Sequence, residues 1–395
     1  MHASANSAAK PDIVIDMSGN PSRERLSSLD IFRGVTIAGM ILVNDPGDWA
    51  SIYWPLRHSQ WNGWTPTDLV FPFFLFIVGV SLVFSFSARR NRGKSRSALM
   101  VHVLRRGIIL FALGVFINGF PNHYNLATLR IEGVLQRIAL CYVIASILYL
   151  VCGPKARWAA VFMCLAGYWI VMRYLPVPGF GVPTHGFPFL DPNRNLAAWL
   201  DRKLLMGHLY NHTNDPEGAL STIPAVASTL LGIFAGEWLR SNRTHTKKIL
   251  RMVFYGIACL VAGEIWSVWF PINKNLWTSS FVLLTGGLAM IGLAICYWIF
   301  DARKIRIRLA DFFLVFGVNA IAAYVLSELL AALITTISFH SAKYGVITLQ
   351  GWTYRVCFAP FAHPVNASLI YAAVYVLVCW IPMWILYRKR ILLKI

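Results

Sequence analysis

A histidine and an aspartate ten positions apart are the residues of this sequence best suited to acid–base chemistry. His58 lies in the aromatic segment YWPLRHSQWNGW, and Asp68 follows in TPTD. An imidazole takes up a proton near neutral pH, and a carboxylate beside it fixes its tautomer. Asp68 also fits a structural role, because Thr65 and Pro66 read as a helix start and an acid in the first turn complements the helix dipole.

Asn44 ends the apolar segment before the histidine, on the same predicted membrane face as His58. A side-chain amide there fits two roles, a helix cap or a hydrogen-bond donor to the oxyanion of an acyl transfer. Asp30 and Arg33 lie three apart near the other end of that segment and fit an ion pair on one helix face. Arg33 alternatively fits an anionic ligand.

Other polar residues stand inside or beside apolar segments, where they are costly and often functional. Arg105 and Arg106 open the third apolar segment and fit either membrane topology or phosphate binding. Gln136 and Arg137 lie near the start of the fourth and are expected to face a cavity. Two groups fit recognition of hydroxyls or amines, namely Asp215 and Glu217 in NDPEG and Asn273, Lys274 and Asn275 in PINKN. PEG alternatively fits a helix start and NKN an ordinary turn.

Composition places most of the chain in lipid. The 395 residues are 57% hydrophobic and 13% charged, with a mean hydropathy of +0.57, whereas soluble domains carry about 25% charged residues. The net charge of +19 falls in short basic clusters between apolar segments, which indicates membrane topology rather than nucleic-acid binding. The seven cysteines form no CxxC pair or Cys/His ligand spacing, so we expect neither a metal nor a disulfide framework.

The elements that must position these residues are membrane helices. A span needs about 20 apolar residues, and the chain holds ten candidate segments. They are 28–45, 67–87, 102–119, 133–152, 157–175, 219–239, 248–269, 277–300, 309–336 and 366–387. The sequence therefore predicts an all-α polytopic membrane protein with about ten transmembrane helices. The segment 309–336 is long enough to be tilted, kinked or to overshoot the bilayer.

Every second loop is basic, which predicts the sidedness of the chain. Basic clusters occur before the first segment and after the second, fourth, sixth, eighth and tenth, so we expect both termini and these loops in the cytoplasm. The loops 46–66, 120–132, 176–218, 270–276 and 337–365 are expected on the opposite side, and with them His58. Residues 1–22 read as a disordered cytoplasmic tail.

Several motifs resemble one family in the same order along nearly the whole chain. RLSSLDIFRGVTI, ILVN, YWPLRHSQWNGWTPTDLVFPFFLFIVG, RIEGVLQR, HLYNHTNDPEGALSTI, PINKNLW and YRKRILLKI resemble the heparan-alpha-glucosaminide N-acetyltransferase family and its bacterial homologues. The start LDxFRG also resembles the broader membrane acyltransferase group. The resemblance implies a single transmembrane acyltransferase domain over 23–395, in a bacterial inner membrane, with homodimers an expected assembly.

The resemblance implies an acetyltransferase that moves an acetyl group from cytoplasmic acetyl-CoA to the amine of a glucosamine-type sugar on the far side. The family's catalytic histidine matches His58, as a base or as the carrier of the acetyl group. On this reading Asp68 orients the imidazole and Asn44 steadies the oxyanion. The residues expected to bind CoA are Arg33, Arg105, Arg106, Gln136 and Arg137. Those expected to bind the sugar are Asp215, Glu217, Asn273, Lys274 and Asn275.

Two alternatives remain open at this point. An N-acetylglucosamine-related sugar transporter could use the same cavity without chemistry, although no internal repeat supports it. A non-catalytic partner in an envelope assembly would leave the His58–Asp68 pair unexplained.

Overall fold

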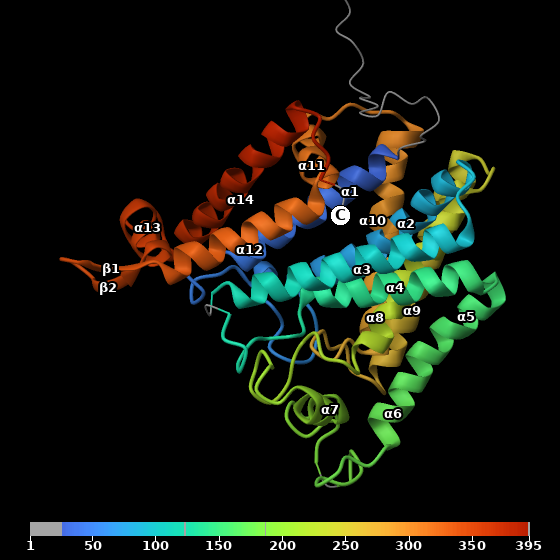
Figure 1. The fold of residues 1–395 in the computed structure, drawn as a ribbon, viewed down its shortest axis with the longest axis horizontal. Helices are drawn as coiled ribbons and strands as arrows, with labels where there is room; N and C mark the ends of the chain where they lie inside the picture. Colours follow the sequence, from blue (N-terminus) through green and yellow to red (C-terminus); the bar gives the residue numbers. More distant parts are fainter. Residues whose placement is uncertain (1–25, 122–123, 186, 394–395) are drawn as a thin grey trace, which may run out of the picture.

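A computed structural model describes residues 26–121, 124–185 and 187–393. The predicted tail 1–22 lies outside the described residues. The first half contains α1 (Ser27–Asn44), the 3-10 helices η1 (Trp54–Leu56) and η2 (Pro66–Leu69), α2 (Val70–Arg90), α3 (Arg96–Gly119), α4 (Val134–Val151), α5 (Pro154–Phe162), the π-helical η3 (Met163–Gly167), α6 (Tyr168–Tyr174) and α7 (Leu196–Leu205). Figure 1 shows these helices in blue to green.

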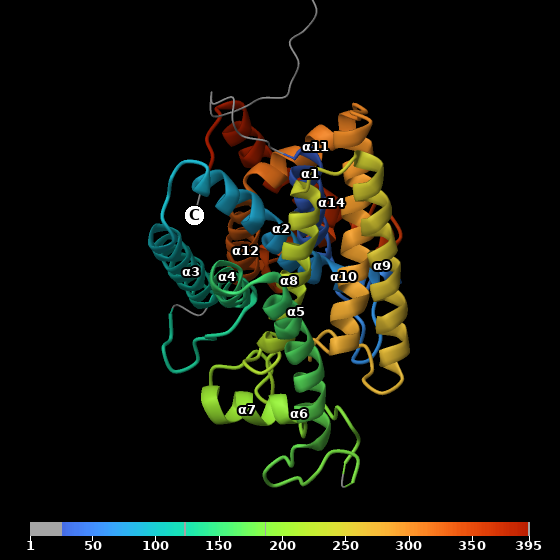
Figure 2. The same ribbon diagram turned by 90° about the vertical axis from the view of Figure 1, so that its right-hand side faces the viewer.

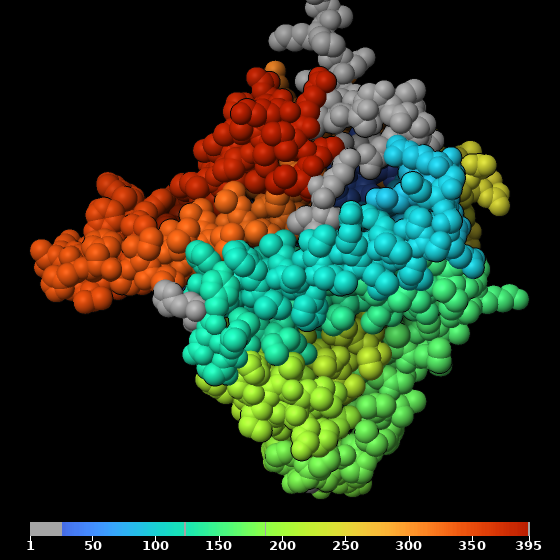
Figure 3. Space-filling model, viewed as in Figure 1, coloured from blue at the N-terminus to red at the C-terminus, as the bar shows by residue number. Residues whose placement is uncertain are grey.

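The second half completes the bundle and adds a small hairpin. It contains α8 (Thr222–Arg240), α9 (His245–Ser267), α10 (Ser279–Cys296), the π-helical η4 (Tyr297–Ala302), α11 (Arg308–Val318), α12 (Ala320–Thr336), β1 (Ser338–Ser341), β2 (Gly345–Thr348), α13 (Leu349–Cys357) and α14 (Pro364–Arg388). The strands pair antiparallel, so the all-α prediction missed one hairpin in the loop 337–365. In Figure 3 this hairpin ends an arm that projects from the bundle.

Seven helices of the described chain are long and apolar enough to cross a membrane, which makes the protein a multi-pass membrane protein. They are Pro66–Arg90, Arg96–Gly119, Val134–Val151, Thr222–Arg240, His245–Ser267, Ser279–Ala302 and Pro364–Arg388. An eighth span forms if α11 and α12 are counted together. They meet at 80°, so the long segment 309–336 is indeed kinked, at Asn319.

The two other predicted segments, 28–45 and 157–175, are helical as α1 and as the continuous run α5–η3–α6. Neither belongs to the seven helices that are long and apolar enough to cross a membrane, because each carries charged residues such as Asp30 and Arg157. The count of ten spans therefore stays a prediction.

Glycines bring helix backbones into contact in the core. A Cβ on Gly34 of α1 would lie 1.7 Å from the carbonyl oxygen of Phe313 in α11, and one on Gly317 would lie 1.8 Å from that of Asp30. Gly79 of α2 approaches α8 in the same way, 2.0 Å from the carbonyl oxygen of Thr229. In lipid, such small residues let helices pack closely. These two contacts hold α1 and α2, which flank the His58 loop, against the bundle.

Loops that alternate along the chain gather at one end of the bundle. Trp61 donates to the carbonyl of Leu190 at 2.9 Å, and the backbone N–H of Gly63 donates to Ile272 at 2.8 Å. His208 contacts the carbonyl of Leu129, and Gln350 that of Pro46. These contacts join all five loops predicted to share a side, and we call this the loop end.

The opposite end holds the basic turns. In Figure 2 the α8–α9 turn and the start of α11 lie at the top, and the α6–α8 segment lies at the bottom. Trp238 donates to the carbonyl of Lys248 at 3.2 Å, and Asn319 donates to that of Ile391 at 3.1 Å. The grouping of the five loops at the loop end is therefore confirmed, and the basic cluster before α1 lies outside the described residues. The assignment of the loop end to the outside of the cell stays a prediction.

Candidate active site

Asp68 lies where the loop after α1 turns into α2. Thr65 caps η2, and Thr65 and Asp68 exchange the hydrogen bonds of a capping box. The Oδ2 atom of Asp68 accepts the backbone N–H of Thr65 at 3.0 Å and that of Ser59 at 3.1 Å. The helix cap expected from the sequence thus fixes the carboxylate, and its second oxygen remains for His58.

His58 and Asp68 form the predicted pair. Nδ1 of His58 lies 2.7 Å from Oδ1 of Asp68. A carboxylate only accepts hydrogen bonds, so this contact places the proton of a neutral imidazole on Nδ1 and leaves the lone pair of Nε2 free. The Asp68 side chain is 0% exposed and that of His58 is 39% exposed. A buried acid thus orients an accessible base, as proton abstraction or nucleophilic attack requires.

Lys274 reaches the same imidazole from the α9–α10 loop. Its Nζ lies 2.9 Å from Nδ1 and 3.4 Å from Nε2 of His58, and 3.5 Å from Oδ1 of Asp68. Burial lowers the pKa of Lys274, while the carboxylates of Asp68 and Glu217 act in the opposite direction. The sequence assigned Lys274 to the acceptor sugar, and the structure places its amine on the His58–Asp68 pair.

The turn that carries Lys274 is held rigidly from within. Asn273 is fully buried, and its side chain donates to Asn62 of the His58 loop at 3.2 Å and accepts the backbone N–H of Leu276 at 2.9 Å. Its backbone N–H donates to the hydroxyl of Thr278 at 3.0 Å. Asn275 lies half-buried in the same turn. Asn273 therefore positions the loops that bring the histidine and the lysine together.

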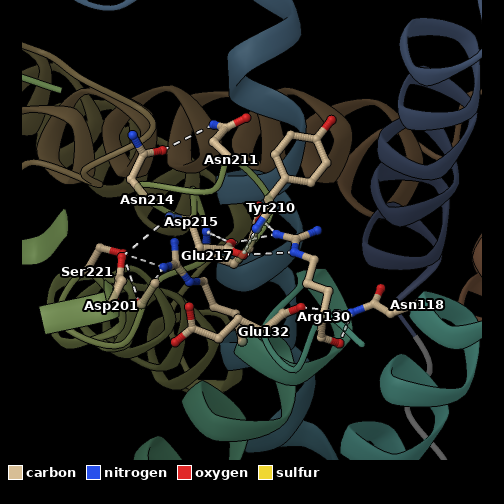
Figure 4. A network of polar contacts seen from close by, with 12 residues as sticks. Asn118, Arg130, Glu132, Asp201, Tyr210, Asn211, Asn214, Asp215, Glu217 and Ser221 are labelled. Atoms are coloured by element: carbon tan, nitrogen blue, oxygen red, sulfur yellow. Dashed lines mark hydrogen bonds and ion pairs between the residues drawn. The ribbon is translucent and has the colours of Figure 1, made fainter. Parts of the chain in front are cut away.

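A second charged cluster lies in the α3–α4 and α7–α8 loops (Figure 4). Arg130 donates to the two oxygens of Asp215 at 2.9 and 2.6 Å and to Glu217 at 2.5 Å. Its guanidinium lies 4.7 Å from the centre of the Tyr210 ring. The sequence expected Asp215 and Glu217 at the sugar, and both are paired with Arg130. The turn 215–218 also precedes α8, which begins at Thr222, so PEG does not form its first turn.

Two further carboxyl groups lie beside the Arg130 cluster. Asp201 of α7 accepts the backbone N–H of Ala219 at 3.1 Å. Oε2 of Glu132 is buried with no hydrogen-bond partner among the described residues. Burial raises the pKa of Glu132 to about 8, helped by the carboxylates of Asp201 and Asp215, and burial raises that of Asp201 to about 6. Glu132 therefore holds its proton at neutral pH.

Gln136 and Arg137 are buried in the first turn of α4, beside this cluster. Arg137 donates to the carbonyl of Gly218 at 3.0 Å and to the hydroxyl of Ser221, and its guanidinium lies 5.2 Å from the ring centre of Trp277. Within the described chain, no partner is found for Nε2 of Gln136. Both residues, expected at the CoA site, lie at the loop end.

Arg33, also expected at CoA, joins three helices. It donates to Asp30 at 3.1 Å, which confirms the predicted ion pair, to the hydroxyl of Ser81 at 2.7 Å and to the carbonyl of Gly317 at 3.0 Å. These contacts tie α1 to α2 and α11. Any contact with CoA would compete with them.

Arg105 and Arg106 lie inside α3, which begins at Arg96, six residues before the expected segment. The helix begins earlier than the expected segment because Ser95 caps it by accepting the N–H of Ala98 at 3.2 Å, and the roles expected of Arg105 and Arg106 stay predictions. Arg105 is exposed. The guanidinium of Arg106 lies 5.0 Å from the ring centre of Tyr142. Among the described residues, the side chains of Arg105 and Arg106 have no hydrogen-bond acceptor, unlike that of Arg33.

Asn44 ends α1 as expected and lies beside the carboxyl group of Glu328 in α12. Among the described residues, Asn44 forms no hydrogen bond with His58 or Asp68. Glu328 in turn lies beside Tyr324 of the same helix. The three catalytic residues expected from the sequence thus divide into a contacting pair and one separate amide.

Sequence reasoning missed Arg130, Glu132 and Asp201. The first two stand in the motif RIEG directly before α4. Two charged residues next to a membrane span were the signal that could have identified them. Asp201 carried no such signal, because it lies in a short amphipathic helix of the loop 176–218. No group of three or more His, Cys, Asp or Glu in the described part of the chain could hold a metal ion.

Comparisons with known proteins agree on one family. A family model described as heparan-alpha-glucosaminide N-acetyltransferase, catalytic, matches residues 25–263. The human heparan-alpha-glucosaminide N-acetyltransferase is 30% identical over 94% of this chain and 60% of its own length. The mouse protein of that name is 32% identical over 78% of this chain and 54% of its own length. The chain thus spans somewhat more than half the length of these curated relatives.

Proposed function

Because the chain belongs to the heparan-alpha-glucosaminide N-acetyltransferase family, we propose that it transfers an acetyl group from acetyl-CoA to the amine of a glucosamine-type sugar. The observation that carries this proposal is the His58–Asp68 pair, with Nδ1 held by a buried carboxylate at 2.7 Å. The exposed ring then offers Nε2 to a substrate. The family match gives no support to the sugar permease.

The reaction forms an amide and breaks a thioester. In the direct route, the nitrogen of the acceptor amine attacks the acetyl carbonyl carbon, and Nε2 of His58 takes a proton from that nitrogen. The C–S bond breaks, and the proton passes to the thiolate to give CoA. In the alternative route, Nε2 itself attacks the thioester, the C–S bond breaks to release the thiolate of CoA, and an acetyl-histidine forms. The amine then displaces the imidazole, and its proton passes through the ring to the thiolate. Asp68 stabilises the positive charge that develops on the ring in both routes.

The other assignments rest on the family resemblance and on the chemistry of each side chain. We assign Asn44 to the oxyanion of the tetrahedral intermediate, on the end of α1. Arg105 and Arg106 carry guanidinium groups suited to the phosphates of CoA. Arg33, Gln136 and Arg137 complete the donor site only if their present contacts rearrange.

The acceptor sugar would bind at the loop end. Lys274 contacts His58 there, Asn273 and Asn275 stand in the same turn, and Asp215 and Glu217 lie in the Arg130 cluster. The chain would lie in a bacterial inner membrane with the His58 loop outside the cell, and a homodimer stays an expectation from the family.

The deciding experiment is an acetyl-transfer assay on the purified protein in proteoliposomes. Acetyl-labelled acetyl-CoA is supplied with glucosamine, and the products are separated as N-acetylated sugar and free CoA. Labelled N-acetylglucosamine with no acetyl-CoA serves as the transport arm. His58-dependent amide formation would support the proposal. Sugar uptake without acetylation of any amino sugar tested would overturn it in favour of a permease.

A further inference from the structure

The described chain places one primary amine against the imidazole of His58. Nζ of Lys274 lies 2.9 Å from Nδ1 and 3.4 Å from Nε2 of that ring. An acceptor amine must reach Nε2, the nitrogen with the lone pair, and Nζ lies 3.4 Å from it. This is slightly beyond the about 2.6–3.2 Å over which a general base works, and such contacts are often looser before substrate binds. Lys274 thus stands where the substrate nitrogen is needed.

The surroundings of Lys274 favour a reactive amine. Its side chain is 19% exposed, and burial lowers its pKa from the ordinary value of 10.5. The groups that face it are His58 from the α1–α2 loop, Asp68 from η2 and Glu217 from the α7–α8 loop. The two carboxylates favour the ammonium form but do not fully offset burial. A larger fraction of Lys274 is therefore neutral than of an exposed lysine.

We propose that Lys274 is a self-acetylation site, whose Nζ stands in for the acceptor amine beside His58 and takes the acetyl group when no acceptor is bound. This inference rests on the proposed acetyl transfer. The bond between Nζ and the acetyl carbon forms and the C–S bond of acetyl-CoA breaks. One proton leaves Nζ through the imidazole and reaches the thiolate, so the products are acetyl-Lys274 and CoA.

The modification has a consequence for turnover. An amide at position 274 is neutral and bulkier, so it no longer balances Asp68 and it fills the space beside His58. Donor without acceptor would therefore inactivate the protein, and an amino sugar would protect it by occupying the same place. The reaction would also release CoA without acceptor, as an acetyl-histidine would. Hydroxylamine separates the two, because it cleaves an acyl-imidazole and leaves an amide intact.

The test is peptide mass spectrometry after incubation of the full-length protein with acetyl-CoA alone. Lys343, an exposed lysine in the β1–β2 turn at the same end of the molecule, reports non-enzymatic acetylation within the same sample. We expect hydroxylamine-resistant acetylation at Lys274 above that at Lys343, and its suppression by glucosamine. Raising the pH should increase acetylation at Lys274 to a plateau below the ordinary lysine pKa of 10.5.

Variants at the base decide whether the modification is enzymatic. His58→Ala and the polar His58→Gln should lower the rate at Lys274 about 100-fold or more, the usual contribution of a general base, and leave Lys343 unchanged. Equal acetylation at Lys274 in wild type and both variants would overturn the inference. Lys274→Arg should lose the hydroxylamine-resistant acetyl group from this peptide.

The outcomes separate this inference from the proposed function. N-acetylated sugar together with an unmodified Lys274 after incubation without acceptor would overturn the inference and leave the function standing. His58-dependent acetyl-Lys274 with no acetylated sugar would support the inference and overturn the choice of acceptor. Absence of both products would overturn both proposals.

Discussion

The His58 cluster and the Arg130 cluster are built from loops at the same end of the bundle, but their charges are arranged differently. In the first, Asp68 holds Nδ1 of a part-exposed imidazole whose Nε2 carries a lone pair, and the amine of Lys274 lies within 3.4 Å of both ring nitrogens. In the second, Arg130 satisfies Asp215 and Glu217 together, and all three side chains are at most 21% exposed. A cluster with an available lone pair can do chemistry, whereas one whose charges are mutually paired holds loops together.

This contrast predicts how substitutions of the charged residues at the loop end should differ in their effects. Substitutions in the His58 cluster should change turnover with little effect on folding. Substitutions in the Arg130 cluster should change folding first. The following variants test that division, from the largest expected effect to the smallest.

The largest effect is expected for His58→Ala. Removing the imidazole should lower the turnover number about 100- to 10,000-fold, the usual range for a general base, and abolish it if His58 carries the acetyl group. The assay is acetylated sugar formed per enzyme, with thermal unfolding in detergent as the folding control. Because the side chain is 39% exposed, the unfolding temperature should change little. Retained turnover would remove His58 from the mechanism.

Arg130→Met should instead destabilise the fold. It leaves the carboxylates of Asp215 and Glu217 buried without their counter-charge, which typically costs about 3–5 kcal/mol. The measurement is thermal unfolding in detergent, and the control is Arg194→Met, which breaks an exposed ion pair with Asp191 in the same long loop. The control should unfold close to wild type. Equal unfolding temperatures for both variants would show that the Arg130 cluster is not structural.

Glu132→Gln should remove part of the pH dependence of stability. The pKa of Glu132 rises from 4.5 to about 8 on folding. At pH values between these two, the folded state keeps a proton on Glu132 that the unfolded state has lost. Its contribution to the free energy of unfolding is therefore present below pH 4.5 and is lost as pH rises towards 8. The variant should lose less stability than wild type over that range.

Unfolding temperatures at a series of pH values measure this difference. Glu264→Gln, which changes a carboxylate near the end of α9 and outside the Arg130 cluster, is the matched control for the loss of one carboxylate. A wild-type slope in Glu132→Gln would show that the carboxyl group is already ionised in the folded protein.

The smallest effects are expected for Arg105 and Arg33, the two arginines compared next. Arg105→Gln should weaken CoA binding about tenfold, or 1.4 kcal/mol, with no loss of stability, because its side chain is exposed. Arg33→Gln should lower the unfolding temperature, since Arg33 bonds Ser81 and Gly317. Calorimetric titration with CoA and thermal unfolding measure the two effects. A CoA affinity unchanged in Arg105→Gln would remove Arg105 from the donor site.

The sequence by itself determined the features that depend on short stretches of chain. Apolar length located the helical segments, and the alternation of basic loops grouped the five loops of the loop end correctly. The pairing of His58 with Asp68 was also accessible, because both lie in one loop whose end is fixed by the Thr65 cap. Each of these is a local matter of hydropathy or capping, which neighbouring residues settle.

Only the tertiary structure decided which distant charges meet. Lys274 reaches His58 across 216 positions, and Arg130 reaches Asp215 across 85. Asp215 and Glu217 had the residue types of a sugar site, and nothing in their own segment showed that an arginine from another loop would pair with them. Such contacts depend on how the helices pack, and on the close approach of glycines such as Gly34 and Gly317. Helix packing therefore separated the charges that can react from those that hold the loops.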